Sequence, residues 1–196
     1  MGSPHAQHTG VGPYRRAVVD DVDGLLSATA TAAAPVEHDN GDFDGAEKTT
    51  GDAGRRRMPR VIIVTLVAEV GGYSTDPWTV AGTVDGVSTT EELTPATADG
   101  GETMRTENAF DSPDLVTISI PTQPGTAGSY QIGVSDIVAP GEEVFRQIVA
   151  NTDGNVVLMG TDGKTELLPM VAQQYLPTEA KRIVGASTTS DLTVWL

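Results

Sequence analysis

The sequence predicts an all-β protein: an antiparallel β-sandwich or barrel, jelly-roll forms included, preceded by an extended N-terminal arm. Beyond residue 57, β-branched and other apolar residues recur at every second position in about nine short segments, as is typical of strands. Asp153-Gly154 and Asp162-Gly163 flank one such segment, and Asp-Gly pairs accept the positive φ angles of hairpin turns. No segment of this part has a long helical pattern.

Residues 1–57 are predicted to be the arm. They contain clusters of Gly, Ala, Pro, Thr and His, few bulky apolar residues and no sustained period. Because backbone ordering costs roughly 1–2 kcal/mol per residue, we expect this segment to become ordered only along other subunits. The chain therefore divides into an arm, 1–57, and a β-sandwich domain, 58–196. Met58, directly before the first strong strand, offers an alternative start of the protein.

Three features of the arm have functional interpretations, and a simpler one is favoured for each. Arg15-Arg16 resembles a twin-arginine export signal, but acidic residues interrupt the apolar stretch that a signal peptide needs. Asn40, Asp42 and Asp44 match the first half of a calcium loop. Gly51 stands where the bidentate Glu is required, which favours a solvated acidic turn. The histidines are interpreted as exposed residues of the arm, and they are His5, His8 and His38.

The β domain begins with the segment 60–70, which is rich in β-branched residues and ends at Gly71-Gly72. Residues 78–87 alternate and contain the turn signal Asp85-Gly86. Polar residues with Pro and Gly predict a long loop over 94–108. Further strands are expected at 115–120 and 130–134.

The last third of the chain has the most regular alternation, and hairpins are predicted at both of its Asp-Gly pairs. Residues 142–149 and 169–176 also allow helices. For the first of these, β-branched residues and the turn that follows favour a strand. The expected strands cover 144–150, 155–160, 165–172, 181–184 and 192–196.

The charge and composition of the chain exclude several classes of function. The sequence has 12 Lys and Arg residues against 27 Asp and Glu, a formal net charge of −15 at pH 7. Such a protein repels nucleic acid, and its longest basic run is Arg55-Arg56-Arg57. The longest apolar run, 61–67, is far shorter than the roughly 20 residues of a membrane helix, so we expect no membrane span. The lack of cysteine excludes disulfides and zinc–thiolate sites.

Catalysis is not expected. No histidine lies in 58–196, so a Ser-His-Asp arrangement there has no base. The adjacent carboxylates Glu91-Glu92 and Glu142-Glu143 would point to opposite faces of a strand and are interpreted as solvated charge. We therefore predict that the protein is not an enzyme, with no cofactor and no catalytic, cofactor-binding or metal-binding residues.

The kind of acidity indicates adaptation to concentrated salt. The basic residues are nine Arg and only three Lys, and 16 Asp outnumber 11 Glu. Neighbouring carboxylates repel one another at low ionic strength, and salt screens this repulsion. The composition resembles that of proteins from extreme halophiles. An ordinary acidic protein, or a GC-rich genome that favours Arg over Lys, is the alternative.

The C-terminal third carries short motifs in a fixed order, and together they resemble the small β-sandwich of head-spike base proteins from tailed phages and gene-transfer agents. The resemblance covers 144–196, and it implies a component of a virion surface. The motifs are Phe145-Arg146-Gln147-Ile148, Asp153-Gly154-Asn155-Val156-Val157-Leu158, Asp162-Gly163, Tyr175-Leu176-Pro177, Lys181-Arg182-Ile183 and Gly185-Ala186-Ser187-Thr188-Thr189, before a closing apolar strand.

A structural protein of a halophilic, haloarchaeal virus is the function that the resemblance and the salt signature predict together. Capsid, vertex turret, head-spike base, decoration and tail-ring components all fit, since each needs self-complementary surfaces rather than chemistry. We expect a virion location and a homo-oligomer in contact with other virion proteins and with a host surface. Such oligomers are usually cyclic, and a vertex would impose a pentamer.

An extracellular carbohydrate- or surface-binding β-sandwich module of a halophile is the alternative. Sandwich domains commonly bind sugars through exposed aromatic rings. The same rings can instead fill the core of a chain with so few large apolar residues. The candidate rings are Tyr73, Trp78, Tyr130 and Trp195.

Overall fold

A computed structural model of the protein describes residues 21–45, 58–185, 188–190 and 192–196. The described residues are almost entirely strands and connecting turns, with one short 3-10 helix, η1 (Pro113–Leu115). Every strand pair is antiparallel, which confirms the predicted all-β class. The strands form two groups, each with its own hydrophobic core.

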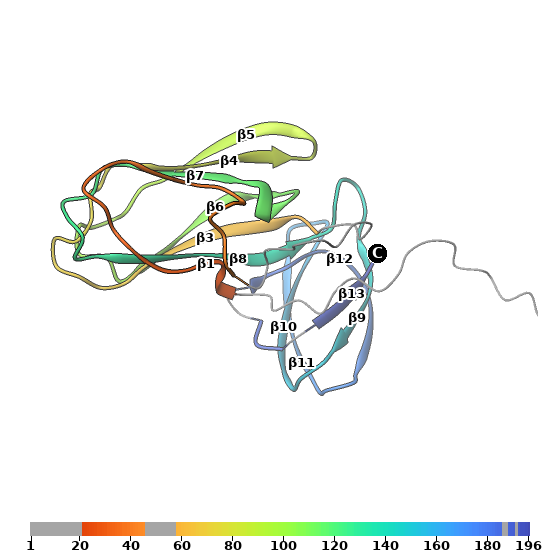
Figure 1. The fold of residues 1–196 in the computed structure, drawn as a ribbon. Coiled ribbons are helices and arrows are strands. Elements are labelled where there is room, and N and C mark those ends of the chain that lie inside the picture. Colours follow the sequence, from red (N-terminus) through yellow and green to blue (C-terminus); the bar gives the residue numbers. More distant parts are fainter. Residues whose placement is uncertain (1–20, 46–57, 186–187, 191) are drawn as a thin grey trace, which may run out of the picture.

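The first group is a jelly roll over 21–138. One of its sheets has the strand order β1-β8-β3-β6, and the other has the order β2-β7-β4-β5. This alternation of early and late strands in both sheets is the jelly-roll topology. Figure 1 shows the two layers facing each other. The strands are β1 (Asp21–Ala30), β2 (Val36–His38), β3 (Arg60–Leu66), β4 (Trp78–Val84), β5 (Val87–Leu93), β6 (Glu102–Phe110), β7 (Thr117–Ile120) and β8 (Ser129–Val138).

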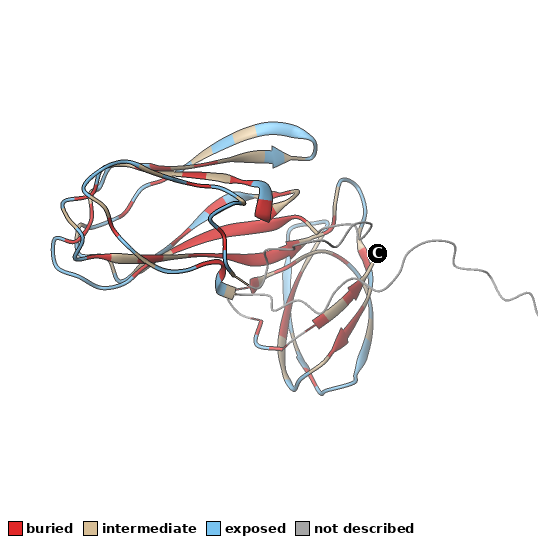
Figure 2. Ribbon diagram, viewed as in Figure 1, coloured by how far each residue is buried: buried red, intermediate tan, exposed pale blue. Residues whose placement is uncertain are grey.

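The jelly-roll core lies between these two sheets, and strands of both sheets carry buried residues (Figure 2). Strand β3 lies between β6 and β8 and is buried over almost its whole length, which agrees with its run of Val, Ile and Leu. The largest fully buried side chains of this core include Trp78, Tyr73 and Tyr130.

The hairpin between β4 and β5 turns at Asp85-Gly86, as its turn signal predicted. Both residues have positive φ, 48° and 77°, and Val84 pairs with Val87. The carboxylate of Asp111 accepts hydrogen bonds from the backbone N–H groups of Asp85 and Gly86 at 3.0 and 2.8 Å. A side chain from the end of β6 therefore fixes this turn.

The second group is a smaller β unit, whose strands lie at an angle to those of the jelly roll (Figure 1). This unit has two sheets, β11-β10-β12 and β12-β9-β13, and they share strand β12. The first half of β12 pairs with β9, and its second half pairs with β10. The last residues of β8 also pair with β12, so one continuous sheet joins the two groups. The strands are β9 (Phe145–Ala150), β10 (Gly154–Gly160), β11 (Thr165–Met170), β12 (Tyr175–Ile183) and β13 (Leu192–Trp195).

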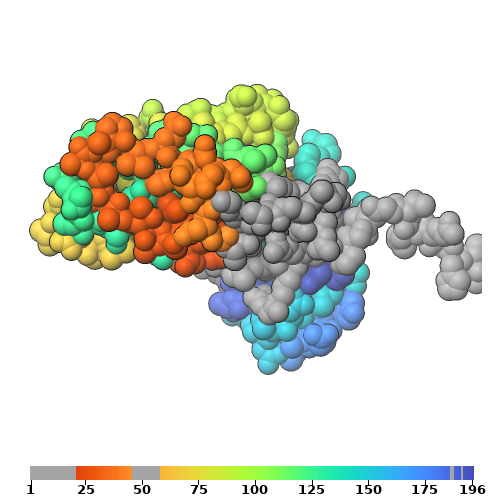
Figure 3. Space-filling view, in the orientation of Figure 1, coloured from red at the N-terminus to blue at the C-terminus, as the bar shows by residue number. Residues whose placement is uncertain are grey.

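The prediction of an arm over 1–57 is wrong for residues 21–45. Strand β1 pairs with β8, β2 pairs with β7, and these residues cover one side of the jelly roll (Figure 3). Leu25, Leu26 and Phe43 are buried in the core. These three large apolar side chains are enough to attach the segment to the jelly roll, because the rest of the sandwich already supplies most of the surface that covers them. Residues 1–20 and 46–57 lie outside the described residues.

A single sandwich domain over 58–196 is also a wrong prediction, because this range contributes to two separate cores. The expected long loop over 94–108 contains most of β6, and β5 was not expected as a separate strand. Strand β6 was missed because its buried residues, Met104, Thr106 and Phe110, alternate with charged and polar ones and include few β-branched side chains.

One of the two Asp-Gly hairpins in the last third is confirmed, and the other is wrong. Gly163 has a φ of 75°, and β10 pairs with β11 across that turn. Strand β9 instead pairs with β12 and β13, so the chain at Asp153-Gly154 crosses between sheets. Gly154 is needed there for close packing, since a Cβ atom would lie 2.8 Å from Thr189 Oγ1 and 2.9 Å from the Ser190 nitrogen. The segments 142–149 and 169–176 form no helix.

Candidate functional site

Three of the four aromatic candidates for sugar binding fill the jelly-roll core. Tyr73, Trp78 and Tyr130 are each at most 1% exposed. The rings of Trp78 and Tyr130 meet edge to face, with centroids 5.1 Å apart. Trp195, on β13, is half-buried. The jelly roll therefore presents none of its three candidate rings to a ligand.

His38 is buried in the structure, which contradicts its interpretation as an exposed residue of the arm. Its Nε2 lies 2.7 Å from the Tyr130 hydroxyl, and its Nδ1 lies 3.9 Å from Asp42 Oδ2. Burial lowers the pKa of His38, with the Asp42 charge acting in the opposite direction. Burial also raises the pKa of Tyr130 to about 12. His5 and His8 lie outside the described residues.

The side chains of the partial calcium motif hold a folded loop together. Asp44 accepts hydrogen bonds from the Ser27 backbone N–H and hydroxyl, at 2.8 and 2.6 Å. The Asn40 amide donates to the Asp114 carbonyl, and Asp42 Oδ2 accepts from the Asp39 N–H. Within the described part of the chain, no three His, Asp or Glu residues are grouped so that they could hold a metal ion.

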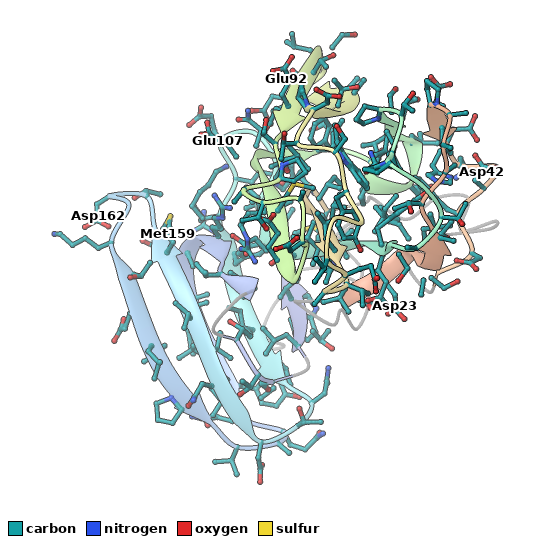
Figure 4. All side chains as sticks on the ribbon, turned by 90° about the vertical axis from the view of Figure 1, so that its left-hand side faces the viewer. Asp23, Asp42, Glu92, Glu107, Met159 and Asp162 are labelled. Carbon is teal, nitrogen blue, oxygen red and sulfur yellow. The ribbon has the colours of Figure 1, made fainter. Side chains whose placement is uncertain are left out.

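The two adjacent carboxylate pairs lie in different settings. Glu91 and Glu92 belong to strand β5, and their side chains have different surroundings, whereas Glu142 and Glu143 lie in a turn. The Glu91 carboxylate accepts hydrogen bonds from the backbone N–H groups of Glu107 and Asn108, and Glu92 is exposed (Figure 4). Glu142 and Glu143 lie in the turn before β9 and are both exposed. Glu91 therefore has a structural partner, contrary to its interpretation as solvated charge.

A buried ionic cluster joins the jelly roll to the smaller β unit, and we call it the Asp136 joint. Asp136 is 2% exposed and has a φ of 30°, and its carboxylate accepts hydrogen bonds from Arg182 Nε at 2.5 Å and the Gly185 N–H at 2.6 Å. Arg60, 3% exposed, donates to the backbone carbonyls of Ser135 and Asp136. The sequence signal for this joint was an acidic residue close after the alternating apolar residues Tyr130, Ile132 and Val134.

A cleft of about 550 Å³ lies between the β4–β5 turn and the segment that leads into the smaller unit. Lys181 Nζ holds that segment by donating to the carbonyls of Ala139, Gly141 and Glu143. The side chains that line the cleft offer three carboxylates, those of Asp85, Asp111 and Glu142, and no imidazole, hydroxyl or amine. The lining residues are Pro59, Asp85, Gly86, Asp111, Pro140, Gly141 and Glu142.

Six uncharged side chains form two neighbouring rows on the outer face of the sheet β12-β9-β13, and the exposed ion pair of Arg146 and Glu179, 3.5 Å apart, lies further along strands β9 and β12. Directly paired residues in antiparallel strands point to the same face, and Ile148, on the other face, belongs to the core. Tyr175 is 64% exposed, whereas Val149 at the centre of the face is 6% exposed. We call this surface the β13 face, and it consists of Tyr175, Val149 and Thr193 in one row and Pro177, Gln147 and Trp195 in the next.

Comparisons of the chain with protein-family models, with curated proteins and with solved structures gave no match. In the part of the chain that the structure describes, no helix is long and apolar enough to span a membrane. The motifs that carry the resemblance to head-spike base proteins lie in the last third of the chain, in the smaller β unit and just after it, and Ala186 and Ser187 of the last motif lie outside the described residues. That resemblance stays a prediction.

Proposed function

We propose that this chain is a structural protein of a halophilic virus, with the jelly roll as its shell-forming part and the smaller β unit as an appended domain. The observation that carries the proposal is the jelly-roll strand order, because this topology recurs in viral capsid subunits. Fold alone does not specify function, so the remaining support must come from the surfaces.

Two features of the surfaces support a role in assembly. The ionic and polar groups described above, such as Asp136, Glu91 and Asp44, hold the protein's own segments together rather than converging on a ligand. The chain is strongly acidic, whereas the six side chains of the β13 face carry no charge and are bordered by the exposed Arg146–Glu179 ion pair. Depletion of charge at the centre of a patch is typical of protein–protein interfaces.

The assembly state in molar salt tests this proposal. The full chain would be purified in about 3 M salt and studied by light scattering coupled to size exclusion and by electron microscopy. We expect closed rings or shells that dissociate when the salt is diluted, because screening of carboxylate repulsion falls. A chain that stays monomeric at every salt and protein concentration would overturn the proposal.

The same preparations test a carbohydrate-binding module. Lectins also use jelly rolls, but three of the four candidate rings are buried in this chain. Binding of soluble glycans by a monomer, with loss of binding in Tyr175→Ala, would favour the module. Assembly without glycan binding would favour the virion protein.

A further inference from the structure

We propose that Asn40 is a site of spontaneous deamidation, and that its conversion to a carboxylate releases residues 36–43 from the jelly roll. We call these residues the β2 segment. Asn40 lies in the loop that follows β2, and it is the one asparagine of the sequence that precedes a glycine, Gly41. The proposal does not depend on the viral role proposed above. It rests on the chemistry of the Asn-Gly pair and on the carboxylate that Asn40 contacts.

The reaction joins two groups that are adjacent in the chain. The Gly41 backbone nitrogen attacks Cγ of the Asn40 amide and closes a cyclic imide, and the bond from Cγ to Nδ2 breaks as ammonia leaves with the Gly41 proton. Water then opens the imide at either of its carbonyl carbons, which gives aspartate or isoaspartate. Glycine favours the first step because it has no Cβ beside the attacking nitrogen.

The loop around Asn40 and Gly41 supplies the groups that the first step needs. Gly41 is exposed and Asn40 is half-buried, so water reaches the pair. The Gly41 N–H donates to Asp39 Oδ1 at 2.7 Å, which places a carboxylate on the nitrogen that must lose its proton. The loop therefore holds the nucleophile, the amide that it attacks and a proton acceptor.

Deamidation sets two carboxylates against each other. Asn40 Nδ2 donates to the Asp114 carbonyl at 2.9 Å and lies 3.4 Å from Asp114 Oδ2. Asp114, in η1, is only 2% exposed, so water screens its charge poorly. A carboxylate at position 40 has no proton to donate and faces both oxygens of Asp114. The product therefore replaces a favourable contact by repulsion between like charges.

The β2 segment has few other attachments to compensate for this repulsion. Strand β2 has three residues and, among the described strands, pairs only with β7. The other anchors shown by the structure are the hydrogen bond between His38 and Tyr130 and the buried side chain of Phe43. Because the lost ammonia does not return, the fraction of molecules with a loosened β2 segment increases with the age of the protein.

Peptide mapping of the aged full chain tests the site. The folded protein would be kept in molar salt at mildly alkaline pH, and mass spectrometry would follow each of the four asparagines. We expect Asn40 to convert first, and Gly41→Ala to suppress its conversion, because a Cβ hinders the attacking nitrogen. Gly41 has no positive φ, and the nearest atom to an added Cβ is the side-chain oxygen Asp39 Oδ1 at 3.0 Å, so alanine can be accommodated. An Asn40 that converts no faster than the other three asparagines, or no faster than in Gly41→Ala, would overturn the proposal.

Hydrogen exchange of a variant that imitates the product tests the release. In Asn40→Asp, we expect amides of the β2 segment to exchange at least about tenfold faster than in the unaltered chain, with no change in peptides of β10 and β11. Asn151→Asp is the matched control. It makes the same change in charge, but its side chain faces the Thr193 hydroxyl at 3.1 Å, which can donate to a carboxylate.

Equal exchange of the β2 segment in the two variants would refute the release. If Asn40→Asp proves unfolded by circular dichroism, the comparison is made between aged unaltered protein and aged Gly41→Ala. The β2 segment should then exchange faster in the unaltered protein, in proportion to the fraction of Asn40 converted. The same exchange in both aged proteins would overturn the proposal.

Discussion

Asp136 is the residue on which the connection between the two β units most depends. Its carboxylate bonds Arg182 and the Gly185 N–H, and Arg60 is buried against the carbonyl groups beside it. Its φ of 30° is a conformation that Asp and Asn tolerate better than most residues. An amide at this position would therefore keep the backbone and the shape of the side chain while removing the charge.

Asp136→Asn should lower the free energy of unfolding by about 2–3 kcal/mol, because partly exposed Arg182 and Arg105 lose the buried counter-charge with which they pair. The estimate is at the low end for a buried pair, since solvent reaches part of Arg182. Denaturant unfolding in fixed salt measures the change. Asp162→Asn, at an exposed hairpin tip (Figure 4), serves as the control and should change stability by less than about 0.5 kcal/mol. Equal effects of the two substitutions would contradict this role of Asp136.

His38 should make stability depend on pH just below neutrality. Burial lowers its pKa in the folded protein, whereas the unfolded chain titrates at the ordinary value of 6.5. As the pH falls through 6.5, the unfolded chain takes up a proton that the folded chain does not, so the free energy of unfolding decreases. We expect the melting temperature to fall between pH 7 and pH 5.5, and to fall less in His38→Gln. A decrease of the same size in both proteins would argue against His38 as the cause.

Neither residue-scale site could be predicted in full from the sequence. The acidic character of Asp136 was visible, but its partner Arg182 lies 46 residues away, and Tyr130 lies 92 residues from His38. Local patterns carry no information about which distant side chains meet in the core. His38 was misassigned because the segment around it looked too polar to fold, although Phe43 and two leucines anchor it.

At the scale of single elements, turn chemistry was predictable where backbone geometry determines it. Asp85-Gly86 and Asp162-Gly163 form turns whose glycines have positive φ, whereas Gly154 is required by packing against Thr189 and Ser190. The dipeptide is the same in all three places, so the sequence cannot separate a hairpin from a crossing between sheets. Strand β6 was missed because an edge strand with one buried face needs few β-branched residues.

Gly86→Ala should destabilise the protein by about 1 kcal/mol. Its φ is 77° and nothing lies within 4 Å of an added Cβ, so the cost is that of the left-handed backbone alone. Gly125→Ala is the matched substitution, because an added Cβ there also meets nothing within 4 Å and its φ is not positive. We expect Gly125→Ala to be neutral or slightly stabilising, since alanine restricts the unfolded chain. Thermal melts that show equal losses for both would refute the assignment of strain to the β4–β5 turn.

At the scale of the whole molecule, the excess of carboxylates should make stability depend on salt. The screening length grows from about 3 Å at 1 M to about 10 Å at 0.1 M salt, so repulsion between surface carboxylates returns on dilution. We expect the melting temperature to rise between 0.1 M and 3 M salt. No change over this range would remove the argument for halophilic adaptation.

Neutralising substitutions separate charge repulsion from the general strengthening of apolar contacts by salt. The triple variant Glu92→Gln, Glu107→Gln, Glu142→Gln removes exposed carboxylates and should need less salt for the same melting temperature. Glu91 is left intact, because its carboxylate binds the backbone of β6. A triple variant with an unchanged salt requirement would assign the dependence to apolar contacts.

The jelly-roll order also determines when the parts of this chain can fold during synthesis. Strand β1 pairs with β8, and Asp21 lies opposite Val134. At typical synthesis rates of about 5–20 residues per second, β1 waits roughly 6–20 s on the ribosome before its partner has been made. Leu25 and Leu26 stay exposed to the cytosol during that interval, which makes this segment a natural client for chaperones. The smaller β unit has all its pairing partners within the last third of the chain and forms last, after the strand that joins it to the jelly roll has emerged.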